Sequence, residues 1–259
     1  MCIMLGCVLC GASAAATGIA RTDPNSRAAH AELIKKALAG HIDVYFLGDS
    51  ITRRWGTADP QYRELYANWQ ANFYGWNAAD FGWGGDTTWN ILWRLKHGEL
   101  DQVKPKVIVL LAGTNDLSGD PQHPLSPDET VRRASAGVAA IVGLCRAKAP
   151  QATLILTGIT PRSDRPQLRP LIARTNARIA RLADGLKVRY LDLSAGFSDT
   201  NGTPAPGMLN PDGLHLAVRG YQVWADALRP LLESLLGPRA ATDAAPPPSR
   251  NPGLGSRAQ

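Results

Sequence analysis

Five short apolar runs alternate with longer segments of helical periodicity, and this alternation constrains the fold more than any other feature of the chain. Strands that are separated by helices pair in parallel, so the pattern predicts an α/β fold. The third run, residues 107–111, is apolar at every position, as expected of a central strand that helices cover on both faces. The five predicted strands are residues 44–47, 76–81, 107–112, 154–158 and 188–193.

The length and composition fit a single globular domain. A chain of 259 residues with 44% hydrophobic residues can bury one sizeable core but is short for two. We expect this domain to span residues 21–237. A capping box that begins at Ser126 predicts a helix across residues 131–147, and the last helix is predicted at residues 218–236. Residues 238–259 lack periodicity and are rich in Pro, Ala, Ser and Gly, which predicts a disordered tail.

The first twenty residues carry no charged side chain and combine an apolar stretch with a run of small residues. Apart from its missing basic residues, this pattern is typical of a secretory signal peptide, so we expect residues 1–20 to direct the protein to the periplasm or outside the cell. A cytoplasmic location is the alternative if the segment is retained, and a lipid anchor at Cys7 or Cys10 is another. The apolar stretch is too short to span a bilayer, so no membrane span is expected in the mature chain.

Cysteine content and charge exclude several classes of protein. Cys145 is the one cysteine outside the signal-like segment, so a disulfide framework is not expected, and its apolar neighbours predict a buried thiol. The net charge is +6, but residues 238–259 supply two of these charges, and no Lys/Arg run has the length expected of a nucleic-acid patch. We therefore expect no nucleic-acid partner.

Four polar clusters follow predicted strands or precede the last helix. Because the carboxyl ends of parallel strands meet at one edge of a sheet, we expect these clusters to converge there. They are Gly48-Asp49-Ser50, then Gly82, Gly84, Gly85 and Asp86, then Gly113-Thr114-Asn115-Asp116, and finally Asp212-Gly213-Leu214-His215.

The first and last clusters together contain the side chains of a catalytic triad. A serine hydroxyl becomes a good nucleophile only when a base removes its proton and a third group orients that base. His215 is the candidate base for Ser50, and Asp212 is its candidate partner. Their spacing of three residues predicts that both lie on one face of a single turn at the start of the final helix.

The remaining clusters contain hydrogen-bond donors for an oxyanion. Attack on an ester carbonyl builds negative charge on oxygen, which the backbone N–H groups of Ser50 and Gly85 and the side-chain amide of Asn115 can stabilise. Taken singly, Ser50 is an ordinary helix cap, Asn115 a turn former and His215 a packed histidine. Their occurrence together, each beside a strand end or a helix start, favours a serine hydrolase site.

The four clusters resemble the sequence blocks of the SGNH, or GDSL, hydrolases across roughly residues 43–232. The stretch from Gly82 to Thr88, with Leu92-Trp93-Arg94-Leu95 and Gly98-Glu99-Leu100, is more specifically similar to the catalytic subunits of intracellular platelet-activating-factor acetylhydrolases and their bacterial relatives. The resemblance implies a flavodoxin-like three-layer α/β/α sandwich with a five-stranded parallel sheet, no metal or cofactor, and hydrolysis of short acyl esters. It implies the nucleophile Ser50, the oxyanion donors Gly85 and Asn115, and the acid and base Asp212 and His215.

Two residues depart from the pattern of the family. Relatives often carry Asn at the position of Asp80, which leaves open how the second cluster is braced. Trp83 is bulkier than the usual aliphatic residue and is expected to reshape the acyl pocket. Trp83 and Asp49 are the side chains that we expect beside the substrate.

Four tryptophans could stack on a sugar or aromatic group, but packing of helices on the sheet is the favoured interpretation. These tryptophans are Trp55, Trp83, Trp89 and Trp93.

The leading hypothesis is a serine esterase that releases short acyl groups, with acetyl expected, from a small molecule or a polysaccharide. We expect a monomer or homodimer. An acyltransferase with the same triad is the first alternative, and a binding module with a vestigial site is disfavoured because no triad member is missing. A metal site for phosphoester cleavage, another alternative, would use Asp49, Asn115, Asp116 and His215.

Overall fold

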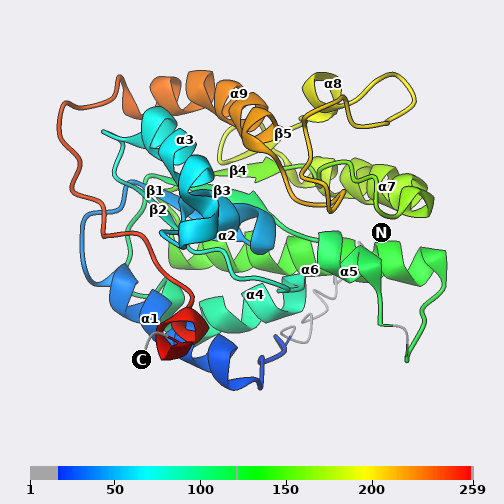
Figure 1. Cartoon of the computed structure of the whole chain (residues 1–259), viewed down its shortest axis with the longest axis horizontal. Coiled ribbons are helices and arrows are strands. Elements are labelled where there is room, and N and C mark those ends of the chain that lie inside the picture. The colour runs from blue at the N-terminus through cyan, green and yellow to red at the C-terminus, as the bar shows by residue number, and fades with distance from the viewer. Residues whose placement is uncertain (1–16, 121, 258–259) are drawn as a thin grey trace, which may run out of the picture.

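The computed structural model describes residues 17–120 and 122–257, and these form three layers with a sheet in the middle (Figure 1). The five strands are all parallel and lie in the order β2-β1-β3-β4-β5, which is the flavodoxin-like order. The α/β class and the five-stranded parallel sheet are therefore confirmed. The strands are β1 (Val44–Gly48), β2 (Ala78–Asp80), β3 (Val107–Leu111), β4 (Thr153–Thr157) and β5 (Val188–Leu191).

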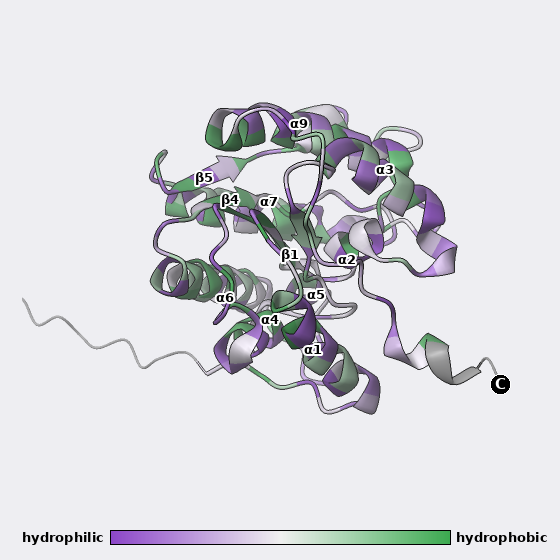
Figure 2. Ribbon diagram, turned by 90° about the vertical axis from the view of Figure 1, so that its left-hand side faces the viewer, coloured by the Kyte–Doolittle hydropathy of each residue, from purple (hydrophilic) through white to green (hydrophobic). Residues whose placement is uncertain are grey.

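Helices cover both faces of the sheet, and the strands between them are mostly hydrophobic (Figure 2). On one face lie α1 (Pro24–Ala37), α4 (Thr88–Arg94), α6 (Pro127–Lys148) and α7 (Arg169–Ile179). On the other lie α2 (Ser50–Gly56), α3 (Arg63–Phe73) and α9 (Val218–Leu236). The shorter helices and helical turns are η1 (Pro60–Tyr62), η2 (Leu95–Glu99), α5 (Thr114–Ser118), η3 (Pro166–Leu168), η4 (Ala180–Leu182), α8 (Ser194–Phe197) and η5 (Pro252–Arg257).

Helix α6 begins where the capping signal places it. The Ser126 hydroxyl accepts a hydrogen bond from the N–H of Glu129 at 3.2 Å, so the helix includes the acidic turn ahead of the predicted range. Cys145 lies on its buried face, and burial raises the pKa of this thiol to about 12. The prediction of a buried thiol is confirmed.

Strand β2 is shorter than predicted because the chain turns just before it. Asn77 has a φ of +48°, which a β-strand does not allow, and its N–H points to the carboxylate of Asp243 at 3.3 Å. Trp76 is nevertheless buried, so the apolar run that predicted a strand reflects packing.

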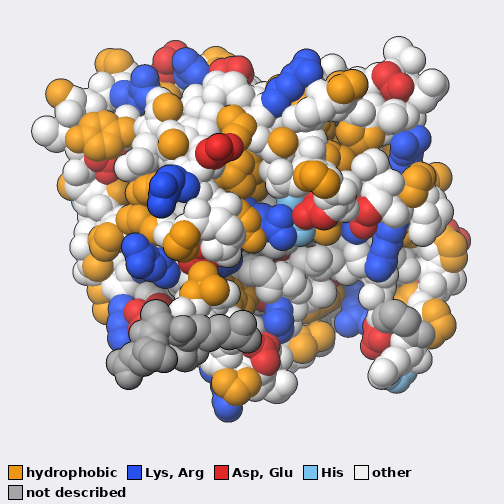
Figure 3. All heavy atoms as spheres, viewed as in Figure 1, with side chains coloured by type: hydrophobic (Ala, Val, Ile, Leu, Met, Phe, Trp, Pro, Cys, Tyr) orange, Lys and Arg blue, Asp and Glu red, His pale blue; other side chains and the backbone are white. Residues whose placement is uncertain are grey.

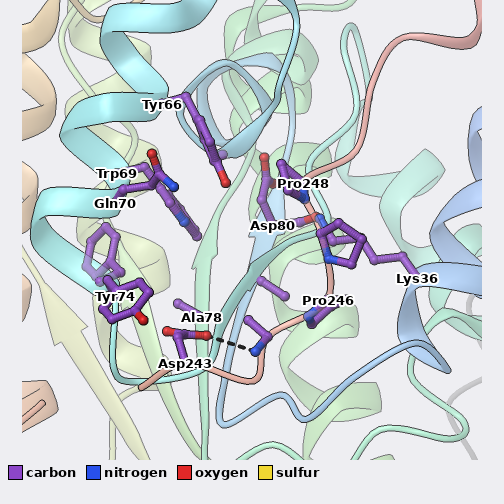
Figure 4. Close-up of a pocket in the computed structure, with 15 residues that line it drawn as sticks. Lys36, Tyr66, Trp69, Gln70, Tyr74, Ala78, Asp80, Asp243, Pro246 and Pro248 are labelled. Carbon is purple, nitrogen blue, oxygen red and sulfur yellow. Dashed lines mark hydrogen bonds between the residues drawn. The ribbon is translucent and has the colours of Figure 1, made fainter. Parts of the chain in front are cut away.

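The C-terminal tail differs from the predicted disorder, because its described residues hydrogen-bond along one side of the domain. Asp243 accepts the Gly75 N–H at 2.6 Å, and the Ser249 carbonyl accepts the Ala58 N–H at 2.9 Å. Between these anchors the tail passes the edge strand β2 with a cavity of about 190 Å³ between them (Figure 4). Prolines have no N–H that needs a partner, so a few contacts are enough to hold this segment.

The structure bears in part on the predicted signal peptide, membrane span and nucleic-acid patch. Most of the signal-like segment, residues 1–16, lies outside the described residues. Within the described part of the chain, no helix has the length and hydrophobicity that crossing a membrane requires. On the face shown in Figure 3, acidic and basic side chains are interspersed rather than gathered into a basic patch.

Candidate active site

Ser50 lies at the carboxyl end of the central sheet, where β1 passes directly into α2. Asp49 caps this helix by accepting the N–H of Ile51 at 2.9 Å, which leaves Ser50 as the first helical residue. A side chain at Gly48 would lie 2.1 Å from the Thr52 hydroxyl, so only glycine allows this sharp passage from strand to helix.

Asp212 and His215 lie in a turn that we call the histidine turn (residues 210–215). The Nε2 atom of His215 is 2.9 Å from the Ser50 hydroxyl, and its Nδ1 atom is 2.7 Å from Asp212 Oδ2. Asp212 Oδ1 also accepts the backbone N–H groups of Leu214 and His215, at 3.0 and 2.9 Å. The structure therefore brings the three predicted triad residues together in series.

The position of this pair differs from the prediction in one respect. The histidine turn ends before α9 begins at Val218, so Asp212 and His215 do not occupy the first turn of that helix. Gly213 has a φ of +68°, which an α-helix does not contain, and the carboxylate of Asp212 closes the turn instead. The spacing of three residues still places both side chains together.

Burial of His215 and the nearby positive charge of Arg54 favour its neutral form. Burial lowers the pKa of His215, the nearby guanidinium of Arg54 lowers it further, and the hydrogen bond to Asp212 opposes both effects. Burial by itself would raise the pKa of Asp212, but hydrogen bonds from the His215 and Leu214 N–H groups outweigh it and hold that pKa well below its usual range. A neutral imidazole beside an ionised carboxylate is the state that a general base requires.

Arg54 is a site residue that the sequence interpretation did not include. Its Nη1 atom donates to Asp212 Oδ2 at 3.2 Å, and its guanidinium lies over the ring of Tyr62. The signal was present, because Arg54 follows Ser50 by four residues and so shares its face of α2.

The second cluster forms a glycine loop (residues 82–86) beside the Ser50 turn. The Trp83 N–H donates to the carbonyl of Gly48 at 3.2 Å, and Gly85 has a φ of +78° that favours glycine. The side-chain amide of Asn115 donates one hydrogen bond, at 2.8 Å, to the carbonyl of Asp86. This contact ties Asn115 to the loop and leaves its second amide hydrogen for another acceptor.

Buried charged side chains hold the glycine loop on its protein-facing side. Arg94, with its side chain 4% exposed, donates to Asp86 at 2.7 Å and forms an ion pair with Glu99. It also donates to the carbonyl of Phe81 at 3.2 Å, and Glu99 contacts His30 of α1 at 2.9 Å. Burial raises the pKa of Asp86 to about 6, and Arg94 opposes this rise. The loop is therefore fixed by Arg94 of α4, which Glu99 of η2 and, through it, His30 of α1 hold in place.

Neither side chain expected beside the substrate is open to it. Asp49 is fully buried, its Oδ2 atom has no hydrogen-bond partner, and burial raises its pKa to about 7. Trp83 is 7% exposed because its indole donates to Ser26 at 2.9 Å and packs under the guanidinium of Arg53. Asp49 shapes the helix start and Trp83 joins α1 to the loop, which corrects both expectations.

Asp80 and the other three tryptophans contact residues of the protein itself. Asp80, where relatives often carry Asn, accepts the Gly82 N–H at 2.7 Å and so braces the start of the glycine loop. Trp55 is fully buried in an aromatic cluster with Phe46 and Trp224, which supports the packing interpretation. Trp89 also packs against the core, and Trp93 stacks on His97.

The alternative of a metal site finds no support in the donor geometry. Both ring nitrogens of His215 are within hydrogen-bond distance of triad partners, and Asp116 accepts from the hydroxyl and the N–H of Thr88. Among the described residues, no group of three or more His, Cys, Asp or Glu side chains is arranged to hold a metal ion.

Comparison with known proteins decides the family. Residues 46–223 match the model of the GDSL-like lipase/acylhydrolase family. The chain belongs to this family. It is therefore an ester hydrolase of the GDSL type, as the resemblance in sequence implies. The match begins within β1 and ends within α9, and it includes all four polar clusters.

Two groups of relatives accompany this GDSL-like acylhydrolase. It is 36% identical over 196 residues to platelet-activating factor acetylhydrolase IB subunit alpha2 of Rattus norvegicus, covering 75% of this chain and 77% of that protein. Its fold resembles a GDSL-like lipase from Bacteroides thetaiotaomicron, with a TM-score of 0.61, 22% identity and coverage of 80% and 98%. It also resembles the acetylxylan esterase Axe2 from Geobacillus stearothermophilus, with a TM-score of 0.55, 20% identity and coverage of 76% and 96%.

Proposed function

We propose that this GDSL-like acylhydrolase releases short acyl groups, above all acetyl, through an acyl-Ser50 intermediate. The observation that carries the proposal is the series of contacts from Asp212 to His215 to Ser50, at 2.7 and 2.9 Å. A neutral histidine between an ionised carboxylate and a hydroxyl has the arrangement needed to activate a serine.

The reaction proceeds in two halves. His215 Nε2 takes the proton of the Ser50 hydroxyl while Oγ bonds to the acyl carbon, and the carbonyl oxygen becomes an oxyanion. The backbone N–H groups of Ser50 and Gly85 and the second amide hydrogen of Asn115 stabilise that oxyanion. The C–O bond to the alcohol breaks, the alcohol oxygen takes the proton from His215, and the acyl group stays on Ser50. Water then attacks the acyl carbon with His215 again as base, which releases the acid and restores Ser50.

The names of two relatives favour acetyl as the acyl group. Subunit alpha2 of platelet-activating factor acetylhydrolase IB is named an acetylhydrolase and is 36% identical to this chain over 75% of its length. The acetylxylan esterase is a neighbour in fold, which makes polysaccharide O-acetyl groups the second substrate class to examine. In either class, the small acetyl group would occupy the site and the larger alcohol would extend from it.

A chain-length series tests the substrate. p-Nitrophenyl acetate, butyrate and octanoate should give kcat/KM values that fall steeply with acyl length, and acetylated xylan measured alongside them tests the polysaccharide class. A flat or rising series would contradict the acetyl preference. Adding alcohols or sugars to the same reactions tests acyl transfer, since transferred ester would appear in place of free acid.

Ser50→Ala tests the mechanism. The variant should lose about four decades or more of kcat and should no longer gain mass from an organophosphonate. Ser234→Ala is the matched control, because Ser234 is an exposed residue of α9. Near-normal turnover in the Ser50 variant would exclude the acyl-enzyme.

We also propose that the segment before Thr17 is a secretory signal peptide. Ile19 hydrogen-bonds to helix α4, through its N–H to the Trp89 carbonyl at 2.9 Å and its carbonyl to the Asn90 amide at 2.8 Å. These contacts favour cleavage ahead of Ile19 over the boundary at Ala20, and the run of small residues that ends at Ala16 places it before Thr17. Intact mass measured on protein exported from a bacterial host tests this: a mature chain that starts at Thr17 supports it, and a chain that keeps Met1 excludes it.

A further inference from the structure

One side chain from the start of the described chain reaches the glycine loop. Arg21 donates through Nη1 to the carbonyl oxygen of Gly84 at 3.1 Å and lies 3.4 Å from a carboxylate oxygen of Asp86. A side chain added at Gly85 would lie 3.2 Å from the same Nη1 atom, so the guanidinium covers the Gly84–Gly85 peptide directly. This contact links residues 63 positions apart.

The contact fixes the direction of a specific donor. The carbonyl of Gly84 and the N–H of Gly85 belong to one trans peptide, and in a trans peptide these two groups point in opposite directions. A carbonyl held toward Arg21 therefore turns the Gly85 N–H away from Arg21. In the proposed function, this N–H is one of the donors for the oxyanion.

The peptide needs such an anchor because glycine lies on both sides of it. Gly85 has a φ of +78°, and a side chain added at Gly84 would meet no atom within 4 Å, so packing around a Cβ atom does not restrain rotation there. A hydrogen bond to a charged donor is stronger than one between neutral groups, and it also polarises the peptide that it binds.

Arg21 is itself held in place. Its Nε atom donates to Asp23 at 3.2 Å, and Asp23 caps α1 through the N–H of Ser26 at 2.8 Å. Two residues earlier, the chain is fixed to α4 by the hydrogen bonds of Ile19. The guanidinium thus reaches the loop from a segment that is anchored on both sides.

We propose that Arg21 is a positioning residue for the oxyanion hole: it orients and polarises the Gly84–Gly85 peptide so that the Gly85 N–H donates to the developing oxyanion. The inference rests on the proposed function, because it assumes that an oxyanion forms beside Gly85. Arg21 acts through the peptide and does not contact the reacting atoms.

Arg21→Met in the full chain tests this role. Removing an oxyanion donor outright costs about 10²–10³ in kcat, and loss of an anchor should cost less, about 10- to 100-fold. KM for p-nitrophenyl acetate should stay within about twofold, because the oxyanion exists only in the transition state. The rate of phosphonylation of Ser50 should fall in parallel with kcat, since the phosphonyl oxygen takes the same position.

Two further variants separate positioning from a general loss of structure. Arg21→Lys should recover part of kcat, because an ammonium can still donate to the Gly84 carbonyl, whereas Arg27→Met should behave as wild type because Arg27 is exposed on α1. The inference is overturned if Arg21→Met keeps kcat within threefold of wild type, or if KM rises and kcat does not fall. It is also overturned if the thermal midpoint of Arg21→Met falls and Arg21→Lys does not restore it. If Ser50→Ala stays active, the proposed function itself fails; if Ser50→Ala is inactive and Arg21→Met is normal, only the role of Arg21 fails.

Discussion

The histidine turn and the glycine loop meet at Ser50, but the side chains that hold them come from different distances along the chain. The hydrogen bonds of Asp212 come from residues no more than three positions away, apart from Arg54, and its side chain is 41% exposed. The glycine loop is held by Arg21, Arg94 and Asn115, which come from three separate parts of the chain. The side chain of Asp212 is thus held mainly from within its own turn, although the Gly213 carbonyl also accepts the N–H groups of Ser163 and Asp164. The glycine loop depends on side chains from three distant segments.

This difference predicts how substitutions in the two halves behave. Asp212 is 41% exposed and stays in contact with water when its partner is lost, and such contacts contribute about 0–1 kcal/mol to stability. The histidine turn can therefore lose the largely buried side chain of His215 without loss of the fold. Buried ions are different, because removal of one partner leaves a charge without compensation. Changes in the histidine turn should affect catalysis alone, whereas loss of a buried charge on the protein-facing side of the glycine loop should also lower stability.

His215→Ala should give the largest effect and should break only catalysis. Loss of the base should lower kcat by about 10⁴- to 10⁶-fold, while the free energy of unfolding stays within about 1 kcal/mol of wild type. Steady-state kinetics with p-nitrophenyl acetate and urea unfolding measure both quantities. A loss of kcat below tenfold would show that another group removes the proton from Ser50.

Arg94→Met should disrupt the glycine loop by lowering the stability of the fold. The substitution strands the buried carboxyl groups of Asp86 and Glu99, which should lower the free energy of unfolding by about 3–5 kcal/mol. Urea unfolding measures this loss. Arg132→Met is the matched control, because its ion pair with Glu129 is exposed on α6 and should matter by less than about 1 kcal/mol. Equal effects of the two variants would contradict the contrast between the halves.

Asn115→Ala should fall between these cases. The variant loses the proposed oxyanion donor and the hydrogen bond to the Asp86 carbonyl, so kcat should fall by about 10²–10³-fold and stability by about 1 kcal/mol. Kinetics and thermal unfolding on the same preparation test the pair of effects. A large rise in KM with unchanged kcat would assign Asn115 to ground-state binding.

Arg54→Gln should give the smallest effect, visible only as a function of pH. The charges beside His215 are Asp212, Arg54 and Arg162, and the positive charge of Arg54 lowers the pKa of His215. Its removal should raise that pKa, so the acid limb of kcat/KM should move to higher pH by less than about one unit, with unchanged activity at pH 8. Arg174→Gln, an exposed substitution on α7, should leave the profile unchanged. A shift toward lower pH would reverse the assigned role.

The parts of the molecule that sequence predicted are those specified locally. Strand runs, the capping of α6 and the cluster from Asp212 to His215 are contained within a few consecutive residues. The support of the glycine loop was not foreseen because Arg21 and Asp86 are 65 positions apart, and no local pattern pairs them. Trp83 was expected to reshape the acyl pocket because it is bulkier than the usual aliphatic residue, but the folded chain buries the side chains of both Trp83 and Asp49.

The proline-rich tail bears on how the molecule behaves at high concentration. Strand β2 ends the sheet, and an open sheet edge invites a strand from another copy to pair with it. Here Lys36 donates to the carbonyl of Asp80, and Pro246 and Pro248 lie along the same side, where they offer no N–H to an incoming strand (Figure 4). A chain shortened before Asp243 would uncover this edge, so loss of the tail should appear first as aggregation and only later, or never, as loss of turnover.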